Sequence, residues 1–163
     1  MAITVRQYDS RDVDAAIKIW NEVVREGIAF PQEDELDAVT GDEFFKAQSF
    51  TGLAVDERGE ILALYILHPN NVGRCAHISN ASYAVRSDVR GRHLGEIIVK
   101  HSIATARKLG FRILQFNAVV ATNIHARHLY QRLGFKELGT IPGGFRMPDG
   151  SFEDIVPQFI DLT

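Results

Sequence analysis

The chain has 163 residues, a formal net charge of −3 at pH 7, and 45% hydrophobic and 24% charged residues. This length is typical of one domain, and the composition is that of a folded globular protein. Eighteen Lys and Arg against 21 Asp and Glu leave no electrostatic footprint for nucleic acid. The only cysteine, Cys75, excludes an internal disulfide and argues against a cysteine-based metal site. We therefore expect one domain over residues 1–163 that binds no nucleic acid.

No segment of the chain is suited to a membrane or to export. The longest apolar run, residues 61–67, is too short to cross a bilayer. The first six residues are typical of a strand and lack the pattern of a signal peptide. We expect a cytoplasmic protein with no membrane partner.

The N-terminal part of the chain predicts a strand and two helices. Residues 4–8 form the strand, and Asp9-Ser10 then offers a helix N-cap. The apolar residues of the first helix, spaced by four, three and four, are Val13, Ile17, Trp20 and Val24. Residues 27–31 break this pattern and indicate a loop. The run Thr40-Gly41-Asp42-Glu43 fits a capping box and predicts that a second helix begins there.

The remaining elements predict a mixed sheet with helices between its later strands. The strand-like runs are residues 50–55, 61–67, 78–85, 113–120, 135–140 and 155–160. Two helices, at residues 94–109 and 124–133, end at the C′ glycines Gly110 and Gly134. A long loop is expected at residues 142–152. The order βααβββαβαββ indicates a single α/β (mixed α+β) domain with helices on both faces of a central mixed sheet.

Residues 86–95 join a predicted buried strand to a predicted helix and contain the first functional pattern. The turn is Arg90-Gly91-Arg92-His93-Leu94-Gly95. Unpaired N–H groups and the helix dipole favour an anion at a helix N-terminus, and two arginines lie at the same place. The turn therefore fits a phosphate or pyrophosphate site, although an ordinary strand–helix connection with solvated arginines has the same pattern.

The second pattern lies at residues 117–135. Asn123 follows a predicted strand, where it can cap the next helix or bind a ligand amide. Tyr130 lies seven residues later, two helical turns along the same face. The two side chains can therefore line one cleft.

These two patterns together resemble the GNAT superfamily of acyl-CoA-dependent N-acetyltransferases. Residues 90–95 are similar to its [QR]-x-x-G-x-[GA] pyrophosphate loop. Asn123-x-x-Ala126-x-x-Leu129-Tyr130, followed by Leu133-Gly134-Phe135, resembles its second cofactor motif with every spacing kept. His93 departs from the pattern, because the family prefers a glycine there. At the start of a helix we expect His93 to adopt a negative φ.

The resemblance implies a cofactor and a set of binding residues. Acetyl-CoA would lie between two splayed parallel strands, residues 78–85 and 113–120. The cofactor-binding residues would be Tyr83, Ala84, Val85, Arg90, Gly91, Arg92, His93, Leu94, Gly95 and Asn123. Tyr130 matches the family's general acid, although a helix tyrosine packed on the core with a wet hydroxyl is the alternative.

The residues that would handle the acceptor amine are less sharply indicated. Many family members have a Glu where this chain has Asn117, so we expect Asn117 to orient the amine or a water. The other polar candidates for a base are His77, Asn80, Glu22 and Glu26, and none is assigned. For substrate binding we name Ile28, Phe30, Asn80 and Arg146; Ile28 and Phe30 fit core packing equally well, and Arg146 fits an ion pair with Glu153 or Asp154 equally well.

The sequence thus predicts an acetyl-CoA-dependent N-acetyltransferase that attacks the thioester directly with the amine of a small molecule. A protein or peptide N-acetyltransferase and a catalytically silent acyl-CoA-binding module are the alternatives. The pair His125-x-x-His128 has metal-like spacing but no third ligand nearby, so we expect no metal. The resemblance leaves a homodimer open.

Overall fold

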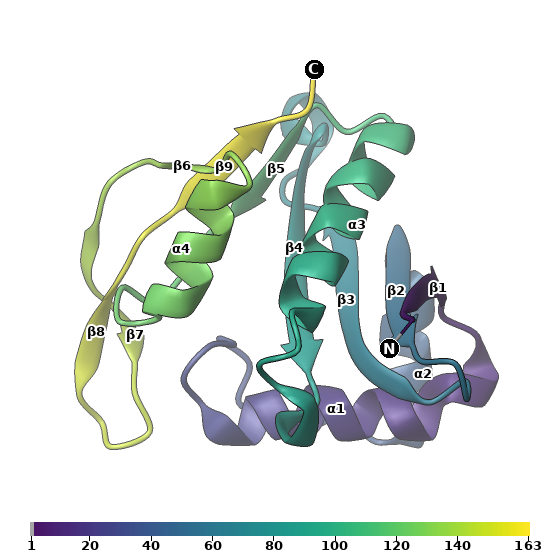
Figure 1. Ribbon diagram of the computed structural model, residues 1–163. Helices are drawn as coiled ribbons and strands as arrows, with labels where there is room; N and C mark the ends of the chain where they lie inside the picture. Colours follow the sequence, from purple (N-terminus) through teal and green to yellow (C-terminus); the bar gives the residue numbers. More distant parts are fainter. Residues whose placement is uncertain (1) are drawn as a thin grey trace.

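The computed structural model describes residues 2–163 and contains a seven-stranded sheet and a separate two-stranded sheet (Figure 1). The strands of the large sheet, in spatial order, are β1 (Thr4–Gln7), β2 (Phe50–Val55), β3 (Ile61–Pro69), β4 (Ile78–Val85), β5 (Ile113–Phe116), β9 (Gln158–Asp161) and β6 (Lys136–Glu137). The small sheet pairs β7 (Ile141–Arg146) with β8 (Phe152–Ile155). The α-helices are α1 (Val13–Glu26), α2 (Ala38–Ala47), α3 (Leu94–Lys108) and α4 (Ile124–Arg132). Single 3-10 turns are η1 (Ser10–Asp12), η2 (Gly73–Cys75) and η3 (Ser87–Val89).

The large sheet is mixed, as the sequence predicts. β1 to β4 are paired antiparallel in chain order, and β5 then lies parallel to β4. β9 runs antiparallel to β5 and separates it from β6. The fold class, a mixed α/β fold with helices around a central sheet, is therefore confirmed.

Both faces of the sheet are buried, and β3 shows how the sequence divides between them. Because side chains alternate along a strand, neighbouring residues belong to different cores. Tyr65 and Leu67 share a cluster with Ile98 of α3. Leu64 and Ile66 share a second cluster with Trp20 of α1. In Figure 1, α3 and α4 lie in front of the sheet with a gap between them that exposes β4 and β5.

Helix α2 begins earlier than the predicted capping box. The carboxylate of Asp37 accepts hydrogen bonds from the N–H groups of Val39 and Thr40, at 2.9 and 2.8 Å, and the Thr40 hydroxyl accepts from the N–H of Asp37. The capping box therefore runs from Asp37 to Thr40. Thr40 is its third helical residue and not its cap, so the predicted start of this helix was wrong.

The C-terminal strands also differ from the prediction. The expected strand 113–120 ends at Phe116, and the expected strand 135–140 shortens to β6. The expected strand 155–160 divides into β8 and β9 around Pro157, which has no N–H to donate to a ladder. The expected loop 142–152 forms most of the β7–β8 hairpin, which the sequence does not signal because Phe145 is the only buried residue of β7.

Candidate functional site

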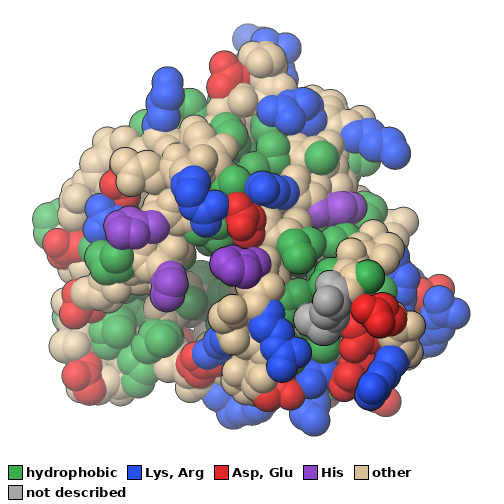
Figure 2. Space-filling view, in the orientation of Figure 1, with side chains coloured by type: hydrophobic (Ala, Val, Ile, Leu, Met, Phe, Trp, Pro, Cys, Tyr) green, Lys and Arg blue, Asp and Glu red, His purple; other side chains and the backbone are tan. Residues whose placement is uncertain are grey.

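A cleft of about 1060 Å³ opens where β4 and β5 separate. The two strands pair only at Ile78↔Ile113 and Ser79↔Leu114. At the next position the side-chain amide of Asn80 donates a hydrogen bond of 2.8 Å to the carbonyl of Gln115. β4 continues to Val85 along β3, so the opposite edge of its second half has no strand neighbour in the described chain. The face shown in Figure 2 is hollowed between the parts that carry α3 and α4, and histidines gather around this hollow.

The turn before α3 forms one wall of the cleft. Between residues 2 and 163, the backbone N–H groups from Arg90 to Glu96 have no acceptor. They therefore remain available at the N-terminus of a helix, where an anion is stabilised. Gly91 has a φ of 84°. This is the arrangement that the sequence predicts for a phosphate site.

His93, however, does not have the backbone conformation expected from the sequence. Its φ is 60°, in the left-handed region, and no side chain caps the helix there. The expectation of a negative φ was therefore wrong. His93 is the N-cap residue of α3, outside the helix proper, and it continues a turn in which Gly91 also has a positive φ. The family's preferred glycine would adopt this conformation without strain.

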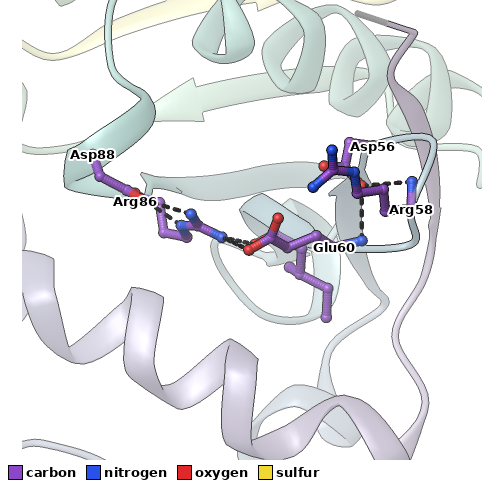
Figure 3. Close-up of polar contacts among 6 residues, drawn as sticks. Asp56, Arg58, Glu60, Arg86 and Asp88 are labelled. Carbon is purple, nitrogen blue, oxygen red and sulfur yellow. Dashed lines mark hydrogen bonds and ion pairs between the residues drawn. The ribbon is translucent and has the colours of Figure 1, made fainter.

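The arginines near this turn have different roles in the structure. Arg90 forms an ion pair with Glu26 at the end of α1, with one contact of 3.1 Å. Arg86 binds both carboxylate oxygens of Asp88, at 2.9 and 2.7 Å, and also Glu60 at 2.9 Å (Figure 3). These bonds hold the end of β4 to the β2–β3 turn. Arg92 is exposed and does not line the cleft.

Tyr130 of α4 lies against aromatic residues at the point where β4 and β5 separate, which we call the β4–β5 fork. Its ring centroid is 4.5 Å from that of Phe116 and 6.4 Å from that of Tyr83. Burial raises the pKa of Tyr130 above its ordinary value, and no group between residues 2 and 163 forms a hydrogen bond with its hydroxyl. The Tyr83 hydroxyl, by contrast, is bonded to Ser102 at 2.7 Å. Tyr130 therefore has a protonated and unengaged hydroxyl in the cleft.

The two asparagines of the second motif are both on the cleft wall. Asn123 caps α4, its side-chain oxygen accepting from the N–H of Ala126 at 3.3 Å. Asn117 forms a reciprocal amide pair with Asn70, with bonds of 2.6 and 3.1 Å, and its oxygen also accepts from Gln115 at 3.1 Å. Asn117 is thus already engaged by its neighbours, and its expected role toward the amine stays a prediction.

The other candidates for a base are also occupied or distant from the cleft. Glu22 accepts from the Ser87 hydroxyl at 2.6 Å, and this bond lowers the pKa of Glu22. Glu26 lines the cleft but is paired with Arg90. His77 is exposed and is not part of the cleft lining.

The predicted substrate residues fall into two groups. Ile28, Phe30 and Asn80 line the cleft; Ile28 is 48% exposed, whereas Phe30 is buried against Trp20 with ring centroids 4.4 Å apart. Arg146 does not line the cleft and pairs with Glu33, which replaces the expected pair with Glu153 or Asp154. Among the predicted cofactor residues, Ala84 does not line the cleft either, because its side chain is buried in the core on the α1 face. Tyr83, Val85 and all residues of the turn except Arg92 do.

Sequence reasoning missed His68, which lines the same cleft from β3. The signal was available, because alternation along residues 61–67 places His68 on the face of Leu64 and Ile66. The histidines of α4, His125 and His128, also line the cleft. Among residues 2–163 no group of three or more His, Cys, Asp or Glu side chains could hold a metal ion.

The sequence model of the Acetyltransferase (GNAT) family matches residues 16–135. The chain belongs to this family. The GNAT match includes both cofactor motifs and the strands that form the fork. The N-acetyltransferase aca1 of Schizosaccharomyces pombe is 32% identical over 94 residues, which are 58% of this chain and 45% of aca1. This chain thus spans less than half the length of that relative.

Two further GNAT relatives match over most of their length. The L-methionine sulfoximine/L-methionine sulfone acetyltransferase of Pseudomonas paraeruginosa is 28% identical, over 87% of this chain and 85% of that protein. The structure of a GCN5-related N-acetyltransferase from Kribbella flavida has a TM-score of 0.90 and 32% identity, covering 98% of each chain. The chain is therefore a member of the GNAT family in fold and in sequence.

The fold is also shared by more distant members of the family. A phosphinothricin acetyltransferase from Sinorhizobium meliloti, solved in complex with acetyl-CoA, has a TM-score of 0.91 at 19% identity, over 99% of this chain and 89% of that one. None of the helices within residues 2–163 has the length and apolar character needed to cross a membrane.

Proposed function

We propose that this GNAT enzyme transfers the acetyl group of acetyl-CoA to the amine of a small molecule. The observation that carries the proposal is the cleft at the β4–β5 fork. On one side it is lined by the turn before α3 with its free N–H groups, and on the other by residues 28–32, which follow α1. Such a cleft can receive a donor and an acceptor from different sides. The relative solved with acetyl-CoA has the same fold.

The residues of the fork fit acetyl-CoA. The unpaired N–H groups from Arg90 to Glu96 suit a pyrophosphate, because several donors and a helix dipole converge there. The edge of β4 beyond Asn80 has no strand partner in the described chain. The amide groups of a pantetheine arm can form hydrogen bonds along this edge in the way that an added strand does. When bound, acetyl-CoA supplies an acetyl thioester at the fork.

Tyr130 is the residue we assign as the acid. A leaving thiolate needs a proton, and a phenol with a raised pKa holds its proton at neutral pH. The hydroxyl has no competing partner within residues 2–163. The role of Tyr130 in this chain is therefore to donate a proton at its Oη and to remain neutral until it does so.

The nature of the cleft favours a small acceptor. Ile28, Phe30 and Met147 contribute apolar surface, and the carboxylate of Glu26 is neutralised by Arg90. A basic peptide tail would need uncompensated carboxylates along its path, which this wall does not offer. The relatives named for methionine sulfoximine and phosphinothricin act on small molecules, and this supports the same class here.

The test is the release of CoA from acetyl-CoA, followed with a thiol reagent. Amino acids and their sulfoximine or phosphinic analogues, polyamines, aminoglycosides and short peptides are offered in parallel. We expect turnover with a small amine and much less with peptides. Turnover with peptides alone would establish the protein or peptide acetyltransferase instead. Tight acetyl-CoA binding without turnover on any amine would leave the silent binding module.

A further inference from the structure

His68 lines the cleft from β3. It is the next-to-last residue of β3 and pairs in register with Asn80, the residue that bridges the fork. Alternation places His68 on the face of Leu64 and Ile66, which is the face covered by α1. Residues 28–32, which follow α1, line the same cleft. His68 and Tyr130 therefore approach the cleft from opposite faces of the sheet, since Tyr130 packs with the α3 core.

The hydrogen bond of the His68 ring fixes which nitrogen is free. Nδ1 is 2.9 Å from the carbonyl oxygen of Pro69. A carbonyl oxygen can only accept, so Nδ1 carries a hydrogen and donates it. In the neutral ring the lone pair is then on Nε2, which has no partner among residues 2–163.

We propose that His68 is the general base that removes the proton from the acceptor amine. This role rests on the proposed function. As the amine nitrogen forms its bond to the acetyl carbon, the C–S bond breaks and Nε2 of His68 takes the surplus proton from nitrogen. Tyr130 supplies the proton that ends on sulfur. The products are an N-acetyl amine and the thiol of CoA. His68 then releases its extra proton to solvent, and Tyr130 takes up a proton from solvent.

The remaining titratable groups around the cleft are less suited to this task. Those that line it are Glu26, Tyr83, Arg90, His93, Glu96, His125, His128, Tyr130 and Arg132. Glu26 is paired with Arg90, and Glu96 with Arg132. His93 lies in the turn before α3, and His125 and His128 lie on α4, so these three reach the cleft from the elements that carry the free N–H groups and Tyr130. Among the histidines that line the cleft within residues 2–163, His68 alone comes from β3.

The experiment compares the variants His68→Asn and His68→Ala with wild type. Asn retains an N–H that can donate to the Pro69 carbonyl, but it has no basic nitrogen. The control is Cys75→Ser, because Cys75 is exposed in the same β3–β4 connection and is not part of the cleft lining. The amine is the best acceptor found for wild type. We measure kcat and kcat/KM between pH 5.5 and 9.5, together with the Kd for acetyl-CoA and the thermal midpoint.

A base at His68 predicts that kcat of both variants falls by about 100-fold at pH 7, the usual range for general base catalysis. The loss should shrink as pH rises, because hydroxide and free amine replace the base. Imidazole added to His68→Ala should restore activity, whereas the Kd for acetyl-CoA and the Cys75→Ser enzyme should not change. An unchanged pH profile and no response to imidazole, with wild type active, would overturn the role of His68. An inactive wild type would instead contradict the proposed function.

Discussion

The side-chain amide of Asn80 on β4 donates to the backbone carbonyl of Gln115 on β5, with 2.8 Å between nitrogen and oxygen. This bond lies one residue beyond the last backbone pair, Ser79↔Leu114. A side chain thus takes the place of the ladder hydrogen bond that separation of the strands removes. It satisfies a half-buried carbonyl and fixes the residue at which the cleft begins.

Replacing Asn80 by Ala should therefore loosen the fork. We expect the free energy of unfolding to fall by about 1–2 kcal/mol, the usual loss when a half-buried carbonyl is left without its donor. The KM for acetyl-CoA should rise, because the edge of β4 is less firmly held. Urea titration and steady-state kinetics measure both effects. Asn80→Asp is the matched control: it keeps the shape but cannot donate when ionised, so stability as high as that of wild type in Asn80→Asp would contradict the bridging role.

Tyr130→Phe removes the hydroxyl that we assign as the acid. We expect kcat to fall by about 100-fold, within the range of acid catalysis. The free energy of unfolding should change by less than about 0.5 kcal/mol, since no hydrogen bond within residues 2–163 is lost. Tyr83→Phe is the comparison, because that substitution breaks the hydrogen bond to Ser102. It should lower the free energy of unfolding more than Tyr130→Phe does, and lower kcat less. Equal kcat in wild type and Tyr130→Phe would exclude the acid role.

The pH dependence gives a second test of Tyr130. Burial raises the pKa of its phenol, so the acid stays protonated beyond the ordinary tyrosine range near pH 10. Loss of the acid form would reduce kcat only as pH rises through that raised pKa. We therefore expect no alkaline decline of kcat between pH 8 and 10 in wild type, measured with saturating acetyl-CoA and amine. A decline centred near pH 9 would show that another group controls this limb.

The sequence was sufficient where pattern and chemistry coincide. Residues 61–67 are a continuous apolar run, and strand 50–55 pairs with them antiparallel. In the turn between the two strands, the Asp56 carboxylate accepts hydrogen bonds from the N–H groups of Arg58 and Glu60. The turn before α3 and the pair Asn123 and Tyr130 could be placed because glycines, helix starts and two-turn spacing have direct geometric meanings. These features indicated the side of the cleft to which we assign acetyl-CoA.

The side to which we assign the acceptor was harder to predict because it depends on partners far apart in the chain. Arg146 pairs with Glu33, which precedes it by more than a hundred residues, and not with its sequence neighbours. Asn117, which follows β5, is engaged by Asn70, which follows β3. Alternation along residues 61–67 indicates the face of His68, but only the register with β4 places His68 opposite Asn80. No local pattern contains these partners.

His93→Gly tests the strain at the turn before α3. A non-glycine residue in the left-handed region destabilises the fold by about 1–2 kcal/mol. Glycine avoids this strain, but it loses more conformational entropy on folding, which offsets part of the gain. We expect His93→Gly to be more stable than His93→Ala by about 1 kcal/mol, because both lack the imidazole and only the backbone preference differs. Thermal and urea unfolding measure this difference. Equal stability of the two variants would mean that φ at residue 93 is not constrained to 60° in solution.

The last prediction concerns Asp12, whose carboxylate is only 6% exposed. Arg6 binds both of its oxygens, at 2.8 and 2.9 Å, and the N–H of Asp9 donates a third bond of 2.9 Å. The hydrogen bond from Arg6 lowers the pKa of Asp12 in the folded protein. Since the folded-state pKa is below the unfolded one, this carboxylate stabilises the fold above the ordinary aspartate pKa near 4. Its contribution is lost as pH falls through the folded-state value.

Asp12→Asn should therefore lower the free energy of unfolding by about 2–3 kcal/mol at pH 7, a typical loss for charged hydrogen bonds to a buried group. The difference from wild type should narrow progressively below pH 4, because wild type loses the same charge by protonation. Urea unfolding at pH 7, 5, 4 and 3 measures the trend. Asp14→Asn is the control, because Asp14 is exposed in the first turn of α1, which directly follows Asp12, and should change stability by less than about 0.5 kcal/mol. A gap between Asp12→Asn and wild type that stays constant down to pH 3 would show that packing, and not ionisation, makes Asp12 stabilising.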